Sequence, residues 1–353
     1  RQRVWGVPLP LFTNKKDGQP LRDIKVINRI ADIYENEGSD AWFNSDPSRF
    51  LGDDYSSDDY DQVQDIVEVW FDSGSTHAFV LEKRKDLIWP ASMYLEGSDQ
   101  HRGWFHSSLL ESAGTRGRAP YDSILTHGFV VDGKGRKMSK SLGNVISPND
   151  VMNKFGVDIL RLWVVASDYY DDLRLDHSIL NAQVDSYRRI RNTFRYLIGN
   201  LDGFEKSEKV SINEFPELEK YILHRLWEIN QVVQKTINDF NFHLMFTTLL
   251  NFCSNDLSSF YFDIRKDTIY CDDKESIKRR SARTLLDLLF NCLVRWFAPS
   301  LVFTCEEAWQ ARGNTSSIHL EEFLLTDNSF NNESLAAKWK LIRNIRKVIT
   351  GAL

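Results

Sequence analysis

The sequence has few cysteines and no paired arrangement of them. Its four cysteines, Cys253, Cys271, Cys292 and Cys305, include no CxxC pair and no Cys/His pair at the spacing of a zinc site. We therefore interpret them as reduced structural thiols, with a metal site as the remote alternative. No metal site and no zinc site are predicted for this chain.

Long apolar runs are also missing. No segment approaches the roughly 18 consecutive apolar residues that a membrane-spanning helix requires, and the first residues, RQRVWGVPLP, lack the charged-then-apolar pattern of a signal peptide. We expect no membrane partner and a cytoplasmic location. The sequence begins with Arg1 and not with an initiator Met, so we expect that it is an interior part of a longer protein.

An excess of positive charge is the third absence. The net charge is -6, which argues against binding of nucleic acid through a uniformly positive surface and leaves only local basic patches for that purpose. With 42% hydrophobic and 27% charged residues, the composition is that of a globular protein. A length of 353 residues predicts about two domains, because one core rarely serves more than roughly 100 to 200 residues.

The first part of the chain has an α/β pattern. Residues 13–65 are rich in Lys, Asp, Asn, Gly and Ser, and we expect peripheral decoration there, with the acidic stretch 52–62 as an exposed loop. Three short apolar segments, IVEVWF, ASMYLEG and SILTHGFVV, alternate with a helical pattern over 101–113. This alternation predicts strands of a parallel sheet.

The second part of the chain is predicted to be a helical bundle. Ser147 and Pro148 predict a helix start that Gly156 would end. Beyond Asp158, apolar residues recur every three or four positions, which predicts helices near 158–166, 178–201, 216–239, 242–264, 275–297 and 299–311. The stretch 202–217 is the most linker-like segment. We expect domains at 1–157, 158–201 and 202–353.

The sequence KMSKS, Lys137 to Ser141, is the most specific motif. Two ammonium groups three residues apart on a glycine-rich loop could fold over a triphosphate and counter the charge that develops as its α-phosphate is attacked. The alternative is a solvated lysine-rich loop. The spacing of glycines and lysine is not that of a Walker A motif, so a P-loop ATPase is disfavoured.

A second motif, YLEGSDQHRGWF from Tyr94 to Phe105, has the pattern of a strand, a tight turn and a helix. Gly97 would let the backbone approach a ligand at the carboxyl end of the strand, where open α/β sheets bind ligands. Glu96 and Asp99 could accept hydrogen bonds from ribose hydroxyls and an ammonium group. His101 could point to the same site, but a histidine at a helix start more often caps or packs.

Together these motifs resemble those of class I aminoacyl-tRNA synthetases. EGSDQHRGWF, with RQRVWG at the start and VWFDSGSTH at 69–77, is similar to the bacterial isoleucine-specific branch in particular, and the similarity runs through SYRRIRNTFRYLIGNL to VRWFAPSLVFTCEEAW. The resemblance implies the second half of a Rossmann-like catalytic domain followed by an α-helical bundle that binds the anticodon. It implies a ligase that activates isoleucine with ATP and Mg²⁺ and transfers it to tRNA(Ile), and we expect a monomer.

The resemblance also assigns roles to individual residues. Lys140 and Lys137 would stabilise the phosphates of ATP as electrostatic groups, with Ser139 beside them, and the amino-acid carboxylate would be the nucleophile. Glu96, Gly97, Asp99 and Gln100 would bind the aminoacyl-adenylate. Trp5 and Trp70 would wall the isoleucine pocket, against the alternative that both are ordinary core residues.

Departures from the family pattern limit what the chain should do. No HIGH motif occurs anywhere in the sequence, and THGF at 126–129 does not fit it. The chain therefore resembles a carboxyl-terminal fragment without the HIGH half, the editing insertion or the cysteine-rich zinc segment of some members. We expect it to be inactive alone.

By the same resemblance the bundle should bind tRNA. Its basic clusters are Arg188–Arg195, Lys278–Arg283 and Arg343–Lys347, and each taken singly could equally be a solvated helix face. Two other functions stay open. One is a noncatalytic tRNA-binding module, and the other is a different nucleotidyl-transfer enzyme of the same fold, which the large helical domain after KMSKS disfavours.

Overall fold

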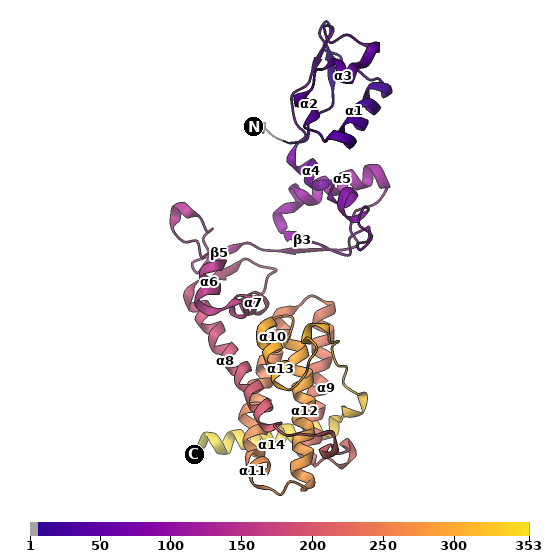
Figure 1. Cartoon of the computed structure of the whole chain (residues 1–353). Helices are drawn as coiled ribbons and strands as arrows, with labels where there is room; N and C mark the ends of the chain where they lie inside the picture. Colours follow the sequence, from indigo (N-terminus) through magenta and orange to yellow (C-terminus); the bar gives the residue numbers. More distant parts are fainter. Residues whose placement is uncertain (1–5, 353) are drawn as a thin grey trace. The chain divides into compact units, whose positions relative to one another are not determined.

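The computed structural model describes residues 6–352 and divides the chain into two compact units, Arg1–His127 and Gly128–Leu353. Both units are coloured by sequence in Figure 1. Trp5 lies outside the described residues. Among the described residues, no helix combines the length and apolar character needed to cross a bilayer.

The first unit opens with a small lobe that has a core of its own. Two antiparallel strands, one near the start of the lobe and one near its end, pair with each other. Helix α1 begins after its cap residue Asp23, whose side chain accepts a hydrogen bond from the Lys25 amide. The elements are β1 (Phe12–Asn14), α1 (Ile24–Glu37), α2 (Ala41–Asn44), α3 (Ser48–Leu51), a 3₁₀ turn (Gly52–Asp54) and β2 (Tyr60–Gln62).

Trp42 fills the centre of this lobe. Its ring contacts Phe12 and Phe50 with centroids 5.1 and 4.9 Å away, and all three side chains are buried. Residues 13–65, expected to be peripheral decoration, therefore form a lobe with a core, which the sequence did not indicate. The polar composition concealed a few large aromatic residues, and aromatic side chains bury enough area to hold a small core.

The rest of the first unit contains one parallel strand pair and two main helices. Its elements are α4 (Val69–Gly74), a π-helical turn (His77–Leu81), β3 (Tyr94–Gly97), a 3₁₀ turn (Ser98–Arg102), α5 (Trp104–Arg116) and β4 (Ile124–His127). Strands β3 and β4 run parallel, with Glu96 opposite Thr126, as the sequence predicted for ASMYLEG and the first part of SILTHGFVV, whose last part belongs to a separate strand, Val130–Asp132.

Only the first half of the predicted strand IVEVWF is extended, with an antiparallel bridge between Ile66 and Pro8, and its second half, from Val69, is instead the start of helix α4. The Glu68 carboxylate accepts a hydrogen bond from the Trp70 amide and so caps the first turn of that helix. Apolar side chains at Val69, Trp70 and Phe71 remain substantially exposed. This local cap outweighs the strand preference of the β-branched and aromatic residues.

The second unit begins with a small α/β layer. Strands β5 (Val130–Asp132) and β6 (Leu173–Leu175) pair in parallel, and helices α6 (Pro148–Phe155) and α7 (Val157–Ala166) pack beside them. Helix α6 is bounded as predicted: the Ser147 side chain caps its first turn, and Gly156 follows its last residue with a φ of +91°.

A helical bundle completes the second unit, and its helices α9, α12 and α13 run side by side in Figure 1. The helices are α8 (His177–Asn200), α9 (Glu217–Asn238), α10 (Phe242–Asn251), α11 (Asp263–Cys271), α12 (Ile277–Phe297), α13 (Val302–Ala311) and α14 (Glu333–Ala352). A π-helical segment, Phe252–Phe262, joins α10 to α11. The bounds of α8, α9, α12 and α13 agree closely with the predicted helices, and the predicted helix 242–264 covers α10 and the π-helical segment, whereas α14 was not predicted.

One large apolar core holds the bundle together, and α8 belongs to it through Ile190, Phe194 and Leu197. The four cysteines are free. Cys253 and Cys292 are buried in this core, and burial raises the pKa of each thiol to about 12. These thiols serve as small core residues.

The linker-like stretch 202–217 is packed against the bundle. Val210 and Phe215 are buried in the bundle core, and two 3₁₀ turns, Lys206–Glu208 and Ile212–Glu214, order the backbone between α8 and α9. The interpretation of this stretch as a linker was wrong. Polar composition indicated exposure but did not show that helix α12 binds the backbone of this segment.

Candidate functional site

The KMSKS loop leaves strand β5 and ends in a 3₁₀ turn, Lys140–Leu142. Met138 points inward and packs against the apolar core of the α/β layer, while Lys137 and Lys140 on either side are exposed. The Ser139 hydroxyl accepts a hydrogen bond from the Leu142 amide at 3.2 Å and caps the turn. The loop therefore presents two ammonium groups from a backbone that is fixed at its centre.

Asp132 organises the first half of this loop. Its carboxylate accepts hydrogen bonds from the Lys134 amide at 3.0 Å, from the Arg136 amide and Nε at 2.9 Å each, and from Asn144 Nδ2 at 3.0 Å. The side chain is largely buried. These donors, Asn144 first, hold the pKa of the Asp132 carboxyl well below its usual range.

Asn144 closes the loop from the other end. Its Oδ1 accepts a hydrogen bond from the Ser139 amide at 2.9 Å, and its Nδ2 donates to the Lys137 carbonyl at 3.2 Å as well as to Asp132. Sequence reasoning missed Asp132 and Asn144. The available signal was their position, because each is a short polar residue that immediately borders the glycine- and lysine-rich loop.

One charged side chain of the loop forms an ion pair within the protein, and two others are exposed to solvent. The Arg136 guanidinium is paired with Asp132 at 2.8 Å. Within residues 6–352, no ion pair joins the ammonium groups of Lys137 or Lys140 to a carboxylate. These two exposed charges are free to meet an anion.

The second predicted motif gathers at the carboxyl end of β3 in the first unit. A Cβ atom at Gly97 would lie 2.7 Å from Asp99 Oδ1 and 3.9 Å from His127 Cε1, so only glycine fits there without displacing Asp99. Glu96 and Asp99 are exposed, and Gln100 Nε2 lies 3.4 Å from Asp99 Oδ2. The structure thus brings Gly97, Asp99 and Gln100 together, with His127 as a neighbour that the sequence did not indicate.

Trp70 lies beside the same turn. Its Cη2 atom would be 3.4 Å from a Cβ at Gly103, and Gln100 Oε1 would be 2.7 Å from that same point. The indole of Trp70 is 41% exposed in this chain. Trp104 fixes the arrangement, because its Nε1 donates to the Ser73 carbonyl at 2.8 Å and so ties α5 to α4.

His101 faces its own turn. Its Nδ1 is hydrogen-bonded to the Ser98 carbonyl, which is the local packing role that the sequence left open. Gln100 has a second local contact, since its Oε1 accepts from the Trp104 amide at 2.9 Å and starts helix α5.

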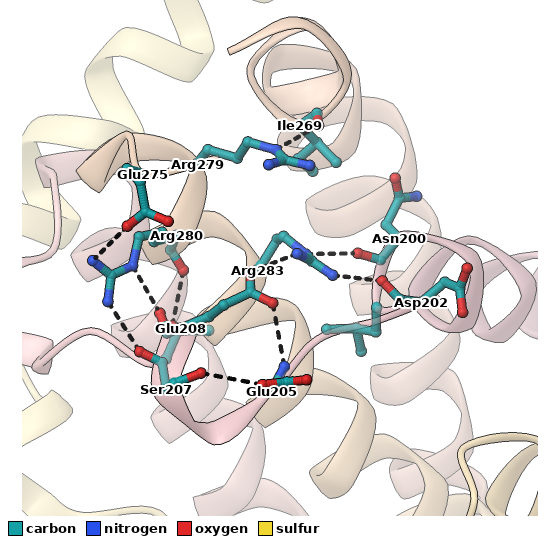
Figure 2. A network of polar contacts seen from close by, with 12 residues as sticks. Asn200, Asp202, Glu205, Ser207, Glu208, Ile269, Glu275, Arg279, Arg280 and Arg283 are labelled. Atoms are coloured by element: carbon teal, nitrogen blue, oxygen red, sulfur yellow. Dashed lines mark hydrogen bonds and ion pairs between the residues drawn. The ribbon is translucent and has the colours of Figure 1, made fainter. Parts of the chain in front are cut away.

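The basic cluster Lys278–Arg283 has a structural role (Figure 2). Arg283 donates to the carbonyls of Asn200 at 3.2 Å and Asp202 at 2.7 Å and pairs with Glu208 at 2.5 Å. Arg280 donates to the Glu208 carbonyl in the same segment. The expectation that this cluster faces RNA was wrong, because its guanidinium groups satisfy backbone carbonyls that pack against α12.

Two arginines of the cluster Arg343–Lys347 on α14 also form contacts within the protein. Arg343 pairs with Asp256, Arg346 pairs with Asp263 at 3.0 Å, and both guanidinium groups lie over the Phe260 ring. These contacts hold α14 against the π-helical segment. The sequence could not distinguish such structural arginines from solvent-facing ones.

The cluster Arg188–Arg195 on α8 is the most exposed of the three. Arg189 and Arg195 have exposed side chains, and within the described part of the chain neither has an ion-pair partner. Arg191 pairs with Glu307 at 3.6 Å. Arg195 borders two hollows, of about 340 and 490 Å³, on either side of α8.

Comparisons with known proteins agree with these motifs. The family model for tRNA synthetases class I (I, L, M and V) matches residues 1–176, and the model for the anticodon-binding domain of tRNA ligase matches residues 219–352. A LeuRS from Agrobacterium radiobacter K84, solved as a ternary complex with tRNA and LeuAMS, has the same fold. Its TM-score is 0.70 at 20% identity, covering 94% of this chain and 42% of that one.

Curated relatives show higher identity. The isoleucine–tRNA ligase of Pelagibacter ubique is 60% identical over 99% of this chain and 39% of its own length. That of Mesorhizobium japonicum is 52% identical over 100% of this chain and 35% of its own length. The chain thus spans less than two-fifths of either relative, and it belongs to the class I tRNA synthetase family.

Proposed function

We propose that this chain is the KMSKS-bearing and anticodon-binding part of an isoleucine–tRNA ligase. The observation that carries the proposal is the pair of exposed ammonium groups, Lys137 and Lys140, on a loop held in place by Asp132 and Asn144. Relatives at 52% and 60% identity that carry the name isoleucine–tRNA ligase support the choice of amino acid.

The first reaction step is activation of the amino acid. The isoleucine carboxylate attacks the α-phosphorus of ATP, the bond to the bridging oxygen breaks, and pyrophosphate leaves. Lys137 and Lys140 oppose the charge that develops on the phosphates, and Ser139 shapes the turn that carries Lys140. ATP brings Mg²⁺ with it as a substrate counterion.

The adenylate is held by the turn after β3. Glu96 and Asp99 offer carboxylates to the substrate ammonium group and to ribose hydroxyls, and Gly97 leaves room for close approach of the ligand. Gln100 is placed beside Asp99. Trp70 offers an exposed indole face to the isoleucine side chain, and Trp5, outside the described residues, is proposed for the same pocket.

The second step transfers the isoleucyl group to the terminal ribose of tRNA(Ile), with release of AMP. We propose the catalytic part at 1–157, a helical connection that contacts the tRNA stem at 158–201 and the anticodon-binding bundle at 202–353. The exposed arginines of α8, Arg189 and Arg195, are the side chains best placed to meet phosphates. The working state is proposed to be a cytoplasmic monomer.

Replacement of the matching segment in an intact relative tests the function. This chain would replace the aligned part of the Pelagibacter ubique enzyme, over which the two sequences are 60% identical. We expect isoleucine-dependent exchange of pyrophosphate into ATP by the chimera. A chimera that binds tRNA without exchange would favour the alternative, a noncatalytic tRNA-binding module.

A further inference from the structure

The two ends of the KMSKS loop are joined to each other by side chains. Asp132 stands at the end of strand β5, where pairing with β6 fixes the backbone. Asn144 follows the loop, and its amide donates to the Asp132 carboxylate at 3.0 Å. This contact spans 12 residues and closes the loop at its base.

The same two side chains also reach into the motif. Asn144 binds the backbone on both sides of Met138, through the Lys137 carbonyl at 3.2 Å and the Ser139 amide at 2.9 Å. Asp132 binds the Lys134 and Arg136 amides before it. Asn144 therefore binds the backbone of Lys137 directly and, through Ser139, the residue that precedes Lys140.

Close packing around the loop supports Asp132 and Asn144. Gly133 follows Asp132, and a Cβ there would lie 2.1 Å from Asp176 Oδ2, the carboxylate that caps helix α8. Met138 packs against the core of the α/β layer. The loop thus has a fixed base and a fixed midpoint, while its two functional ammonium groups stay exposed.

We propose that Asp132 and Asn144 are positioning residues that hold the KMSKS loop in its working conformation. The proposal rests on the function proposed above, since it assigns a consequence in ATP activation to the two side chains. Neither side chain needs to touch ATP. Each acts through the backbone that places Lys137 and Lys140, so loss of either misplaces both charges together.

The first test uses the chain itself and does not need catalysis. Arg136, Lys137 and Lys140 are trypsin sites within the loop. Trypsin can cut the loop only after the loop opens locally, and in the parent this opening must break the hydrogen bonds of Asn144. Asn144→Ala removes these bonds and should therefore speed cleavage at these sites about tenfold. The melting temperature should stay within about 2 °C. Asn149→Ala, which removes an exposed amide from α6, is the matched control and should cleave at the original rate.

The second test measures pyrophosphate exchange by the chimera described above. Asn144→Ala and Asp132→Asn should each lower kcat about 10- to 100-fold, as expected when a charged group is misplaced by about 1 Å. The KM for isoleucine should change less than about twofold, because that pocket is built elsewhere. The exchanged pair, Asp132→Asn with Asn144→Asp, restores one donor and one acceptor and should recover part of kcat.

These outcomes separate the positioning role from the proposed function. If the unsubstituted chimera exchanges and Lys140→Ala abolishes exchange, the proposed function stands. In that chimera, a kcat for Asn144→Ala within about twofold of the parent, or trypsin cleavage as slow as in the parent, would overturn the positioning role. An unsubstituted chimera without exchange would overturn the proposed function, and the catalytic consequence of the pair with it.

Discussion

Lys140 is the residue whose loss should be felt most directly in catalysis. Lys140→Ala in the chimera should reduce isoleucine-dependent exchange by about 10²- to 10³-fold, because one electrostatic contact to the transition state is removed. Lys134→Ala, another exposed lysine of the same loop, is the matched control and should stay near the parent rate. Exchange by Lys140→Ala within a few-fold of the parent would reject the role given to Lys140.

Trp70 tests the amino-acid side of the site. Trp70→Ala in the chimera should raise the KM for isoleucine about tenfold or more, while the KM for ATP changes little, because the exposed indole offers a large apolar face. Steady-state exchange at varied isoleucine and ATP measures both constants. Phe79→Ala removes an exposed aromatic ring elsewhere in the first unit and should leave both unchanged. An unaltered isoleucine KM would remove Trp70 from the pocket.

At this scale the sequence predicted which motifs carry chemistry but not how they are held. Lys137 and Lys140 were recognisable from KMSKS alone. Asp132 and Asn144 were not, because an aspartate or asparagine beside a glycine-rich loop is common, and only the fold shows that one carboxylate collects four donors. His127 likewise became a neighbour of Gly97 only through the parallel register of β3 and β4.

At the scale of elements, Arg283 fastens the segment after α8 to helix α12 (Figure 2). It is 7% exposed, and its loss would leave two carbonyls and Glu208 without their donor. Arg283→Ala should lower the free energy of unfolding by about 3 kcal/mol. Urea unfolding of the chain measures this change, and Arg189→Ala, an exposed arginine on α8, should shift it by less than about 0.5 kcal/mol.

The substitution Arg283→Ala should affect stability but not tRNA binding. Arg283→Ala protein that is still folded should bind tRNA as the parent does, because its guanidinium faces the interior. A loss of tRNA affinity at unchanged stability would show that the cluster Lys278–Arg283 is part of the RNA-binding surface.

Most helices of the bundle were predictable from periodicity, because each has one apolar stripe that one core buries. Helix α12 illustrates this, with Leu285, Leu289 and Leu293 buried on successive turns. Helices α1 and α14 were not predicted, and the other errors came from features without such a period. The lobe around Trp42 depends on contacts between distant residues, α4 depends on the cap from Glu68, and the stretch 202–217 depends on arginines of α12.

For the whole molecule, RNA binding by a chain of net charge -6 must depend on local cations. The chain should bind tRNA weakly, with affinity falling as salt rises because each phosphate contact releases counterions. Arg189→Ala with Arg195→Ala should weaken binding and reduce the salt slope by about one for each arginine that binds a phosphate. Filter binding across a salt series measures both, with Lys154→Ala on α6 as the control. Salt-independent binding would show that α8 is only a solvated face.

Catalysis is predicted to be divided between this chain and segments that it does not contain. Its 353 residues include KMSKS but no HIGH motif, and both are expected to grip the same ATP. The chain alone should therefore show no isoleucine-dependent exchange. Isoleucine, leucine and valine exchange by the chimera with the Pelagibacter ubique enzyme is the most direct measurement. We predict robust exchange with isoleucine, weaker exchange with valine and none above background with leucine. The absence of exchange by the chimera, or exchange by the isolated chain, would rule out this division of catalysis.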